Sequence, residues 1–121
     1  MMLSLHCRLL DGYHDEFDVL LTSFDDASFL DSFLALKKHT QAHFAHEEAL
    51  MKQYNFQGWH EHYEDHQKIL AELSYFYEMA ENGRQLFAKN YIKNGIKERF
   101  DLHIRNLDSQ LALFLNMQGV E

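Results

Sequence analysis

The chain has 121 residues, 46% of them hydrophobic, with no proline and five glycines, which predicts one mainly helical domain over residues 1–121. Its formal charge of −8, from 11 Lys and Arg against 19 Asp and Glu, argues against nucleic-acid binding, which needs clustered cations. No apolar run is long enough to span a membrane, the first residues do not resemble a secretory signal, and the single cysteine, Cys7, suits a reducing compartment, so we expect a cytoplasmic protein.

Apolar residues recur three or four positions apart along the chain and predict four helices. The predicted helices cover about residues 9–24, 29–54, 59–79 and 90–117. Turn residues separate them at 25–28, at 55–58 and at 81–83, and Asn94-Gly95 is a weak point near the start of the fourth helix. Short connections between four helices predict an all-α fold, an antiparallel up-down-up-down four-helix bundle.

Histidine is the unusual residue, because nine occur in 121 residues and histidine is the commonest metal ligand. Two pairs are spaced four residues apart, which places each pair on one face of its helix. The candidate ligands come from all four predicted helices: His14, then His43 and Glu47, then His62 and His66, then His103 and Asp108.

When the helices fold back on one another, these seven positions fall within roughly 8 Å of a common level, at about 1.5 Å of rise per residue. One spacing fits less well. His103 and Asp108 are five residues apart, which leaves them about 140° apart on an α-helix. We therefore expect Asp108 to serve only if the metals lie deep enough between the helices to be approached from both sides.

Five imidazoles and two carboxylates exceed what one tetrahedral zinc ion needs. Two metals bridged by both carboxylates would use every group, with three histidines on one ion and two on the other. Imidazole suits iron, copper, zinc and nickel, so the ligand types alone do not choose the metal.

The ligand set, in this order and with these spacings, resembles the motif of the hemerythrin family, and the stretch 43–51 is similar to its bacterial branch. The resemblance covers about residues 9 to 117. It implies two iron ions, ferrous or ferric, joined by a bridging oxo or hydroxo group, with dioxygen as the ligand that the centre binds.

The resemblance also implies how the ligands are shared. One iron, coordinatively filled, would be held by three histidines (His62, His66 and His103). The other, with an open position for dioxygen, would be held by His14 and His43, and Glu47 and Asp108 would bridge the two.

Four apolar residues close to the ligands correspond to positions that line the oxygen pocket in that family: Phe17, Phe44, Phe100 and Ile104. Arg99 stands where the bacterial members usually have a tryptophan.

The other polar residues are expected outside the ligand set. Five are expected at the surface: His6, His46, His60, Glu48 and Glu61. His39, one turn before His43, points toward the same face of its helix and would either support a ligand or simply pack there. Cys7 is expected to be inert.

The function that this reading favours is reversible dioxygen binding by an oxygen carrier, store or local supplier. Such a protein is not an enzyme, beyond weak oxidase or peroxidase side activity, and is expected as a monomer or weak homo-oligomer. Alternatives are an oxygen- or redox-sensing module that acts on a partner protein, and a di-iron peroxidase or nitric-oxide-handling enzyme. Metal storage and a purely structural bundle are the remaining readings.

Overall fold

The computed structural model describes residues 4–5 and 7–120. Its elements are α1 (Arg8–Thr22), the 3₁₀ turn η1 (Asp26–Ser28), α2 (Phe29–Gln53), α3 (Trp59–Glu81), α4 (Gln85–Asn90), the π-helical turn η2 (Tyr91–Gly95), α5 (Ile96–His103), the π-helical turn η3 (Ile104–Asp108) and α6 (Ser109–Met117). The segments from α4 to α6 follow one another without a break and form the fourth rod of the bundle.

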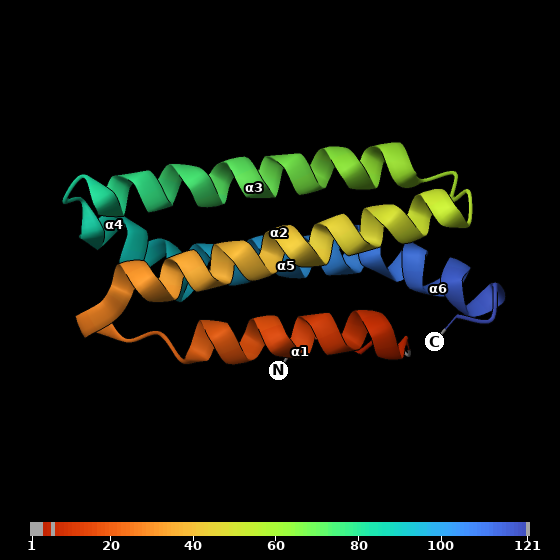
Figure 1. The fold of residues 1–121 in the computed structure, drawn as a ribbon, viewed down its shortest axis with the longest axis horizontal. Helices are drawn as coiled ribbons and strands as arrows, with labels where there is room; N and C mark the ends of the chain where they lie inside the picture. Colours follow the sequence, from red (N-terminus) through yellow and green to blue (C-terminus); the bar gives the residue numbers. More distant parts are fainter. Residues whose placement is uncertain (1–3, 6, 121) are drawn as a thin grey trace.

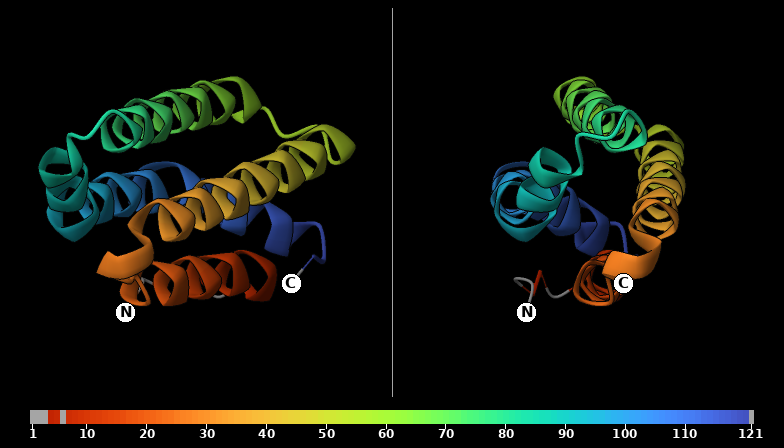
Figure 2. Two further views of the ribbon diagram at one scale, coloured as in Figure 1. Left: turned by 60° about the vertical axis from the view of Figure 1, so that its left-hand side comes forward. Right: turned by 90° about the vertical axis from the view of Figure 1, so that its left-hand side faces the viewer.

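Consecutive rods run antiparallel to each other (Figure 1), and the end-on view in Figure 2 shows the four rods arranged around a common axis. In Figure 1, α3, α2 and α1 follow one another across the view, and the fourth rod passes behind α2. Helix α2 packs against both α1 and α3. The predicted all-α four-helix bundle is confirmed, and the part of the chain that the structure describes contains no strand.

The turns end the helices for reasons that the sequence contains. Asn55 takes a positive φ of 55° after α2, a conformation that asparagine tolerates better than most residues. Gly83 has a φ of 86° after α3, and the amide of Arg84 donates to the carbonyl of Met79 over 2.8 Å, which is the glycine-terminated cap of a helix.

The fourth rod departs from the predicted element. It begins at Gln85 rather than near Asn90, because the cap at Gly83 allows a new helix to start two residues later. The weak point at Asn94-Gly95 falls within the π-helical turn η2, so the rod continues through it and does not start after it.

The buried apolar side chains form two clusters. The larger apolar cluster contains Phe17 of α1, Phe44 of α2, Ile69 of α3 and Phe100 of α5 among its members. The smaller apolar cluster consists of Cys7, Leu10, Met51, Leu111, Ala112 and Leu115. Among the residues described, none of the helices combines the length and apolarity needed to cross a membrane.

Candidate metal centre

Between the two apolar clusters lies a layer of buried polar side chains, which we call the ligand layer. Its members come from every rod, and each is at most 2% exposed: His14, His43, Glu47, His62, His66, His103 and Asp108. On α1, for example, His14 lies between Leu10 of the smaller cluster and Phe17 of the larger one. The structure thus brings together all seven predicted ligands, and it leaves none of them at the surface.

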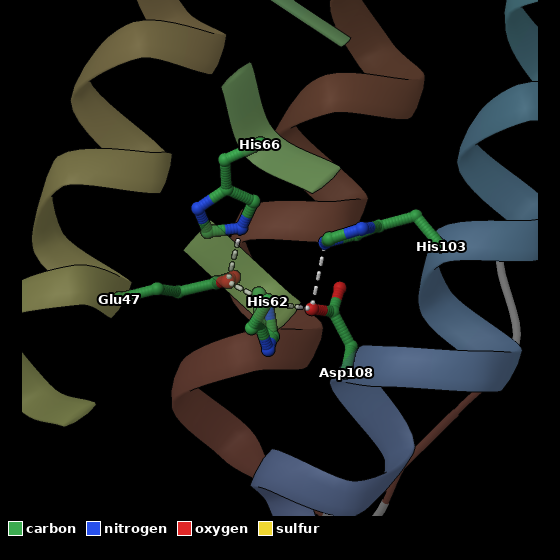
Figure 3. Close-up of side chains that lie close together, drawn as sticks. All are labelled: Glu47, His62, His66, His103 and Asp108. Atoms are coloured by element: carbon green, nitrogen blue, oxygen red, sulfur yellow. Dashed lines mark hydrogen bonds and ion pairs between the residues drawn. The ribbon is translucent and has the colours of Figure 1, made fainter. Parts of the chain in front are cut away.

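The Glu47 carboxylate occupies one side of the ligand layer (Figure 3). Its Oε1 lies 3.0 Å from Nε2 of His62 and 3.2 Å from Nε2 of His66. Its Oε2 forms a hydrogen bond with Nε2 of His43, which lies one turn before it on α2. Three imidazoles from two helices therefore turn the same nitrogen toward one carboxylate.

The Asp108 carboxylate occupies the opposite side. Its Oδ1 lies 2.9 Å from Nε2 of His62 and 3.0 Å from Nε2 of His103, and its Oδ2 lies 2.8 Å from Nε2 of His14. All five buried histidines therefore direct Nε2 to the centre of the bundle. This is the arrangement that a pair of metal ions held between two carboxylates requires.

The five-residue spacing from His103 to Asp108 is accommodated by the helix itself. The residues between them belong to the π-helical turn η3 (Ile104–Asp108), in which hydrogen bonds close over five residues instead of four. Residues five apart therefore come to lie one above the other. The expected offset of about 140° between His103 and Asp108 assumed a regular α-helix, and the π-turn removes that offset.

The donor atoms fall into two groups whose members lie within 4.8 Å of one another. One group holds three histidines and both carboxylates: Glu47, His62, His66, His103 and Asp108. The other holds His14, His43 and Glu47. These groups match the sharing of three and two histidines between two ions that the sequence suggested.

The chemistry of the donors fits bound cations. Without a cation, the two fully buried carboxylates lie among the imidazoles and repel each other. Nε2 of His66 and Nε2 of His103 each lie within 3.2 Å of a carboxylate oxygen, but without hydrogen-bond geometry in the described structure. Unpaired polar atoms are costly in an interior. Two divalent ions would take up these lone pairs and neutralise the carboxylates, so the site fits a pair of metals.

In the metal-free site, burial and the charges of neighbouring side chains have opposite effects on the pKa of the histidines and the carboxyls. Burial opposes the charge on His103, but Asp108 and Asp65 outweigh it and raise the pKa of His103 to about 10. Burial likewise opposes the charge on His62, and its hydrogen bonds to Asp108 and Glu47 raise the pKa of His62. Burial opposes ionisation of both carboxyls, but their histidine neighbours hold the pKa of Glu47 and of Asp108 well below the usual range.

Two acidic side chains outside the ligand layer contact it, and sequence reasoning missed both. Glu48 was expected to be a solvated surface charge, but its side chain is only 21% exposed and its Oε2 lies 2.8 Å from Nδ1 of His66. The Oδ2 of Asp65 lies 2.6 Å from Nδ1 of His103. Each acid directly adjoins a ligand in the sequence, and that adjacency was the available signal.

The Arg99 side chain pairs with two acidic residues of α3, Asp65 and Glu72. Its guanidinium binds Asp65 through two hydrogen bonds, Nη2 to Oδ1 over 2.6 Å and Nη1 to Oδ2 over 3.2 Å. Its Nε lies 3.8 Å from Oε2 of Glu72. The side chain that stands in place of the expected tryptophan therefore contacts a ligand histidine indirectly, through Asp65.

The predicted pocket residues are buried beside the ligand layer. The rings of Phe17 and Phe100 stack with centroids 4.0 Å apart, and the ring of Phe44 lies flat on His66, 3.8 Å away and within 5° of parallel. Ile104 is also buried. On the other side, the ring of Tyr13 stacks on His43 at 4.7 Å.

The histidines outside the ligand layer lie as follows. His46 and His60 are exposed, as is Glu61, and His60 pairs with Glu64 at 2.9 Å. His6 lies outside the described residues. His39 is half-buried, with its Nε2 3.4 Å from the backbone oxygen of Tyr13. Cys7 is buried as a free thiol.

The chain is similar to a bacteriohemerythrin of Ralstonia nicotianae, with 30% identity over 115 aligned residues that cover 90% of this chain and 81% of that protein. No protein-family model matches the chain, and no solved structure matches it. The similarity to the bacterial protein extends over nearly the whole chain.

Proposed function

The chain belongs to the hemerythrin family, and from this premise we propose that it binds dioxygen reversibly at a pair of non-haem iron ions. Residues 1–121 would form a single domain of this kind, acting as an oxygen carrier, store or local supplier. The observation that carries the proposal is the convergence of five Nε2 atoms on two buried carboxylates.

We assign the ligands from the two donor groups. His62, His66 and His103 would hold one iron, and His14 and His43 the other. Glu47, which belongs to both groups, and Asp108, whose two oxygens face His103 and His14, would lie between the irons with a solvent-derived oxo or hydroxo bridge. The iron pair would supply the reversible exchange of two electrons with dioxygen. The position with two histidines has fewer protein donors, and this leaves room there for a small ligand.

The protein's own side chains would keep this site dry. Phe17, Phe44, Phe100 and Ile104 are each at most 2% exposed, and we assign to them the lining of the oxygen pocket. Excluding water strengthens the electrostatic interactions in a site and suppresses side reactions. A carrier needs this protection, because access of water and protons favours irreversible oxidation.

The fixed charge of the site supports binding over oxygen cleavage. Two carboxylates are the only acidic members of the ligand layer, and anionic ligands are what stabilise highly oxidised iron. A site with few of them favours release of unchanged oxygen.

Cys7, a buried free thiol, suits a reducing compartment, and we propose that the protein is located in the cytoplasm.

The proposal is tested by loading the metal-free protein with ferrous iron under nitrogen, admitting air, and then removing the oxygen. A visible absorption band that appears in air and disappears on deoxygenation, over several cycles, is the expected result. One irreversible change to a ferric spectrum would contradict oxygen carriage and favour a peroxidase or a sensor. A capacity well below two irons per chain would contradict the site itself.

A further inference from the structure

The five buried histidines differ in what contacts Nδ1, the ring nitrogen that faces away from the centre of the ligand layer. Nδ1 of His103 lies 2.6 Å from Asp65, and Nδ1 of His66 lies 2.8 Å from Glu48. By contrast, Nδ1 of His14, of His43 and of His62 has no hydrogen-bond partner within residues 4–5 and 7–120. In the three-histidine group, two histidines therefore have a carboxylate partner at Nδ1. In the two-histidine group, neither histidine has one.

A carboxylate at Nδ1 determines what Nε2 does. An ionised carboxylate only accepts hydrogen bonds, so Nδ1 of His66 and of His103 carries the hydrogen and donates it. Once a metal ion has displaced any proton from Nε2, the lone pair of Nε2 faces the centre of the ligand layer. Such an outer partner fixes the tautomer and the ring orientation of a ligand and raises its basicity.

Arg99 holds the acceptor of His103 in place. Asp65 belongs to α3 and His103 to α5, so their hydrogen bond joins two rods. Arg99 lies one turn before His103 and donates a hydrogen bond to each oxygen of the Asp65 carboxylate. With one oxygen at Arg99 Nη2 and the other shared between Arg99 and His103, the Asp65 carboxylate has little freedom to rotate. The side chains of Arg99 and Asp65 are only 23% and 20% exposed, so solvent screens this pair weakly.

We propose that Arg99 is a positioning residue, which fixes Asp65 as the hydrogen-bond acceptor of His103 and, together with Glu48 on His66, makes the three-histidine position the tighter of the two metal positions. The proposal rests on the proposed function only in taking the ligand layer as a metal site. Its consequence is an order of events: metal enters at His62, His66 and His103 first and leaves that position last.

The order is tested with Zn²⁺, added to the metal-free full-length protein in competition with a coloured chelator. Wild-type protein is expected to take up two ions in two separate steps of unequal affinity. His14→Ala is expected to retain the tighter step and lose the weaker one, whereas His66→Ala is expected to lose the tighter one. Two steps of equal affinity would overturn the proposal.

The role of Arg99 is tested in the same titration. Arg99→Met, which keeps the length of the side chain, and Asp65→Asn are each expected to weaken the tighter step about 10–100-fold, the usual effect of losing an outer partner, and to leave the weaker step unchanged. Arg99→Lys is expected to recover part of the loss. Lys97→Met removes one positive charge from the same helix and is the matched control, with both steps as in wild type.

An unchanged tighter step in Arg99→Met, or an equal loss in both steps, would overturn the role of Arg99. Circular dichroism of the metal-free variants checks folding, and if Arg99→Met does not fold, Asp65→Asn and Glu48→Gln decide the same question. An NMR signature adds to it: in the zinc-loaded protein the ring Nδ1–H of His66 and of His103 should exchange slowly, and Asp65→Ala should remove only the second.

The outcomes separate this inference from the oxygen-binding proposal, because zinc does not bind dioxygen. Two unequal zinc steps in a protein whose iron form fails to bind oxygen would overturn the proposed function alone. Equal zinc steps in a protein that binds oxygen reversibly would overturn the metal order alone.

Discussion

Nε2 of His103 lies 3.0 Å from Oδ1 of Asp108, although the two residues are five positions apart in the chain, because the helix between them is wound as a π-turn. The extra residue is absorbed locally, and the flanking segments α5 and α6 keep their buried faces. The π-turn is therefore the local device that places a second carboxylate opposite Glu47.

Shortening the π-turn by one residue should leave metal binding intact, whereas lengthening it by one residue should not. Deleting the exposed residue Asn106 reduces the spacing to four, which on an α-helix leaves the carboxylate about 40° from His103, so two metals per chain should still be bound. Inserting one alanine after Asn106 gives a spacing of six, about 240° of rotation, and metal content should fall to one ion or fewer. The measurement is metal per chain after loading and dialysis, and equal loss in both variants would contradict this account of the register.

Removing the metals should lower the stability of the protein without unfolding it. The two apolar clusters remain when the ions leave, so the helical circular dichroism signal of the metal-free protein should be close to that of the loaded form. The Tm should drop by roughly 10–20 °C, since free metal at a thousandfold above Kd stabilises by about 4 kcal/mol. A loaded protein that melts at the same temperature as the chelator-treated one would show that the layer holds no tightly bound ion.

The metal-free protein should be most stable in a mildly acidic window. The pKa of His103 rises from 6.5 unfolded to about 10 folded, so its contribution is complete below about pH 6.5 and is lost as the pH rises toward 10. Glu47 and Asp108 have folded pKa values below 4.5 and 3.8, so their contribution is present above these values and is lost on acidification.

Thermal melts in the presence of chelator, from pH 4 to 9, test this window. Metal binding must displace the proton of His103, so the loaded form should bind its ions more tightly as the pH rises across the same range. The Tm of the two forms should therefore move in opposite directions above pH 6.5. Parallel curves would contradict a protonated His103 in the metal-free site.

Substitutions at Phe100 should distinguish its contribution to the free energy of unfolding from its effect on reversible oxygen binding. Phe100→Ala removes a buried ring that stacks on Phe17 and should cost about 3–5 kcal/mol in the free energy of unfolding. Phe100→Leu should cost less, yet admit water beside the ligand layer and reduce the number of oxygen-binding cycles before irreversible oxidation. Phe33→Leu in the same apolar cluster, ten residues before His43 on α2, is the control, with a similar loss of stability and no change in cycling.

Much of this fold and site could be predicted from the sequence, because the spacing of residues along a helix determines which of them share a face. His43 with Glu47, and His62 with His66, lie one turn apart, and that alone places each pair on one face. The four rods followed from the recurrence of apolar residues every three or four positions, and the turns between them followed from runs of Asp, Ser, Asn and Gly. The π-turn at Asp108 lay beyond this reasoning, because a regular period of 3.6 residues was assumed throughout.

The outer partners were missed for a different reason. Glu48 and Asp65 are each one residue away from a ligand, which on a helix turns them about 100° from it. They therefore face the neighbouring rod, and only the packing of rods decides whose ligand they meet. Glu48 on α2 reaches His66 on α3, and Asp65 on α3 reaches His103 on α5.

The smaller apolar cluster also bears on how long an ion stays bound. Its members come from the N-cap and first turn of α1, the last turn of α2 and the final helix α6, so they close the ligand layer at the end of the bundle where the fourth rod finishes. The ends of helices open locally at lower cost than the core of a protein. We therefore expect fraying of that end to set the residence time of a bound metal, and the amide protons of α6 to exchange with solvent at a matching rate.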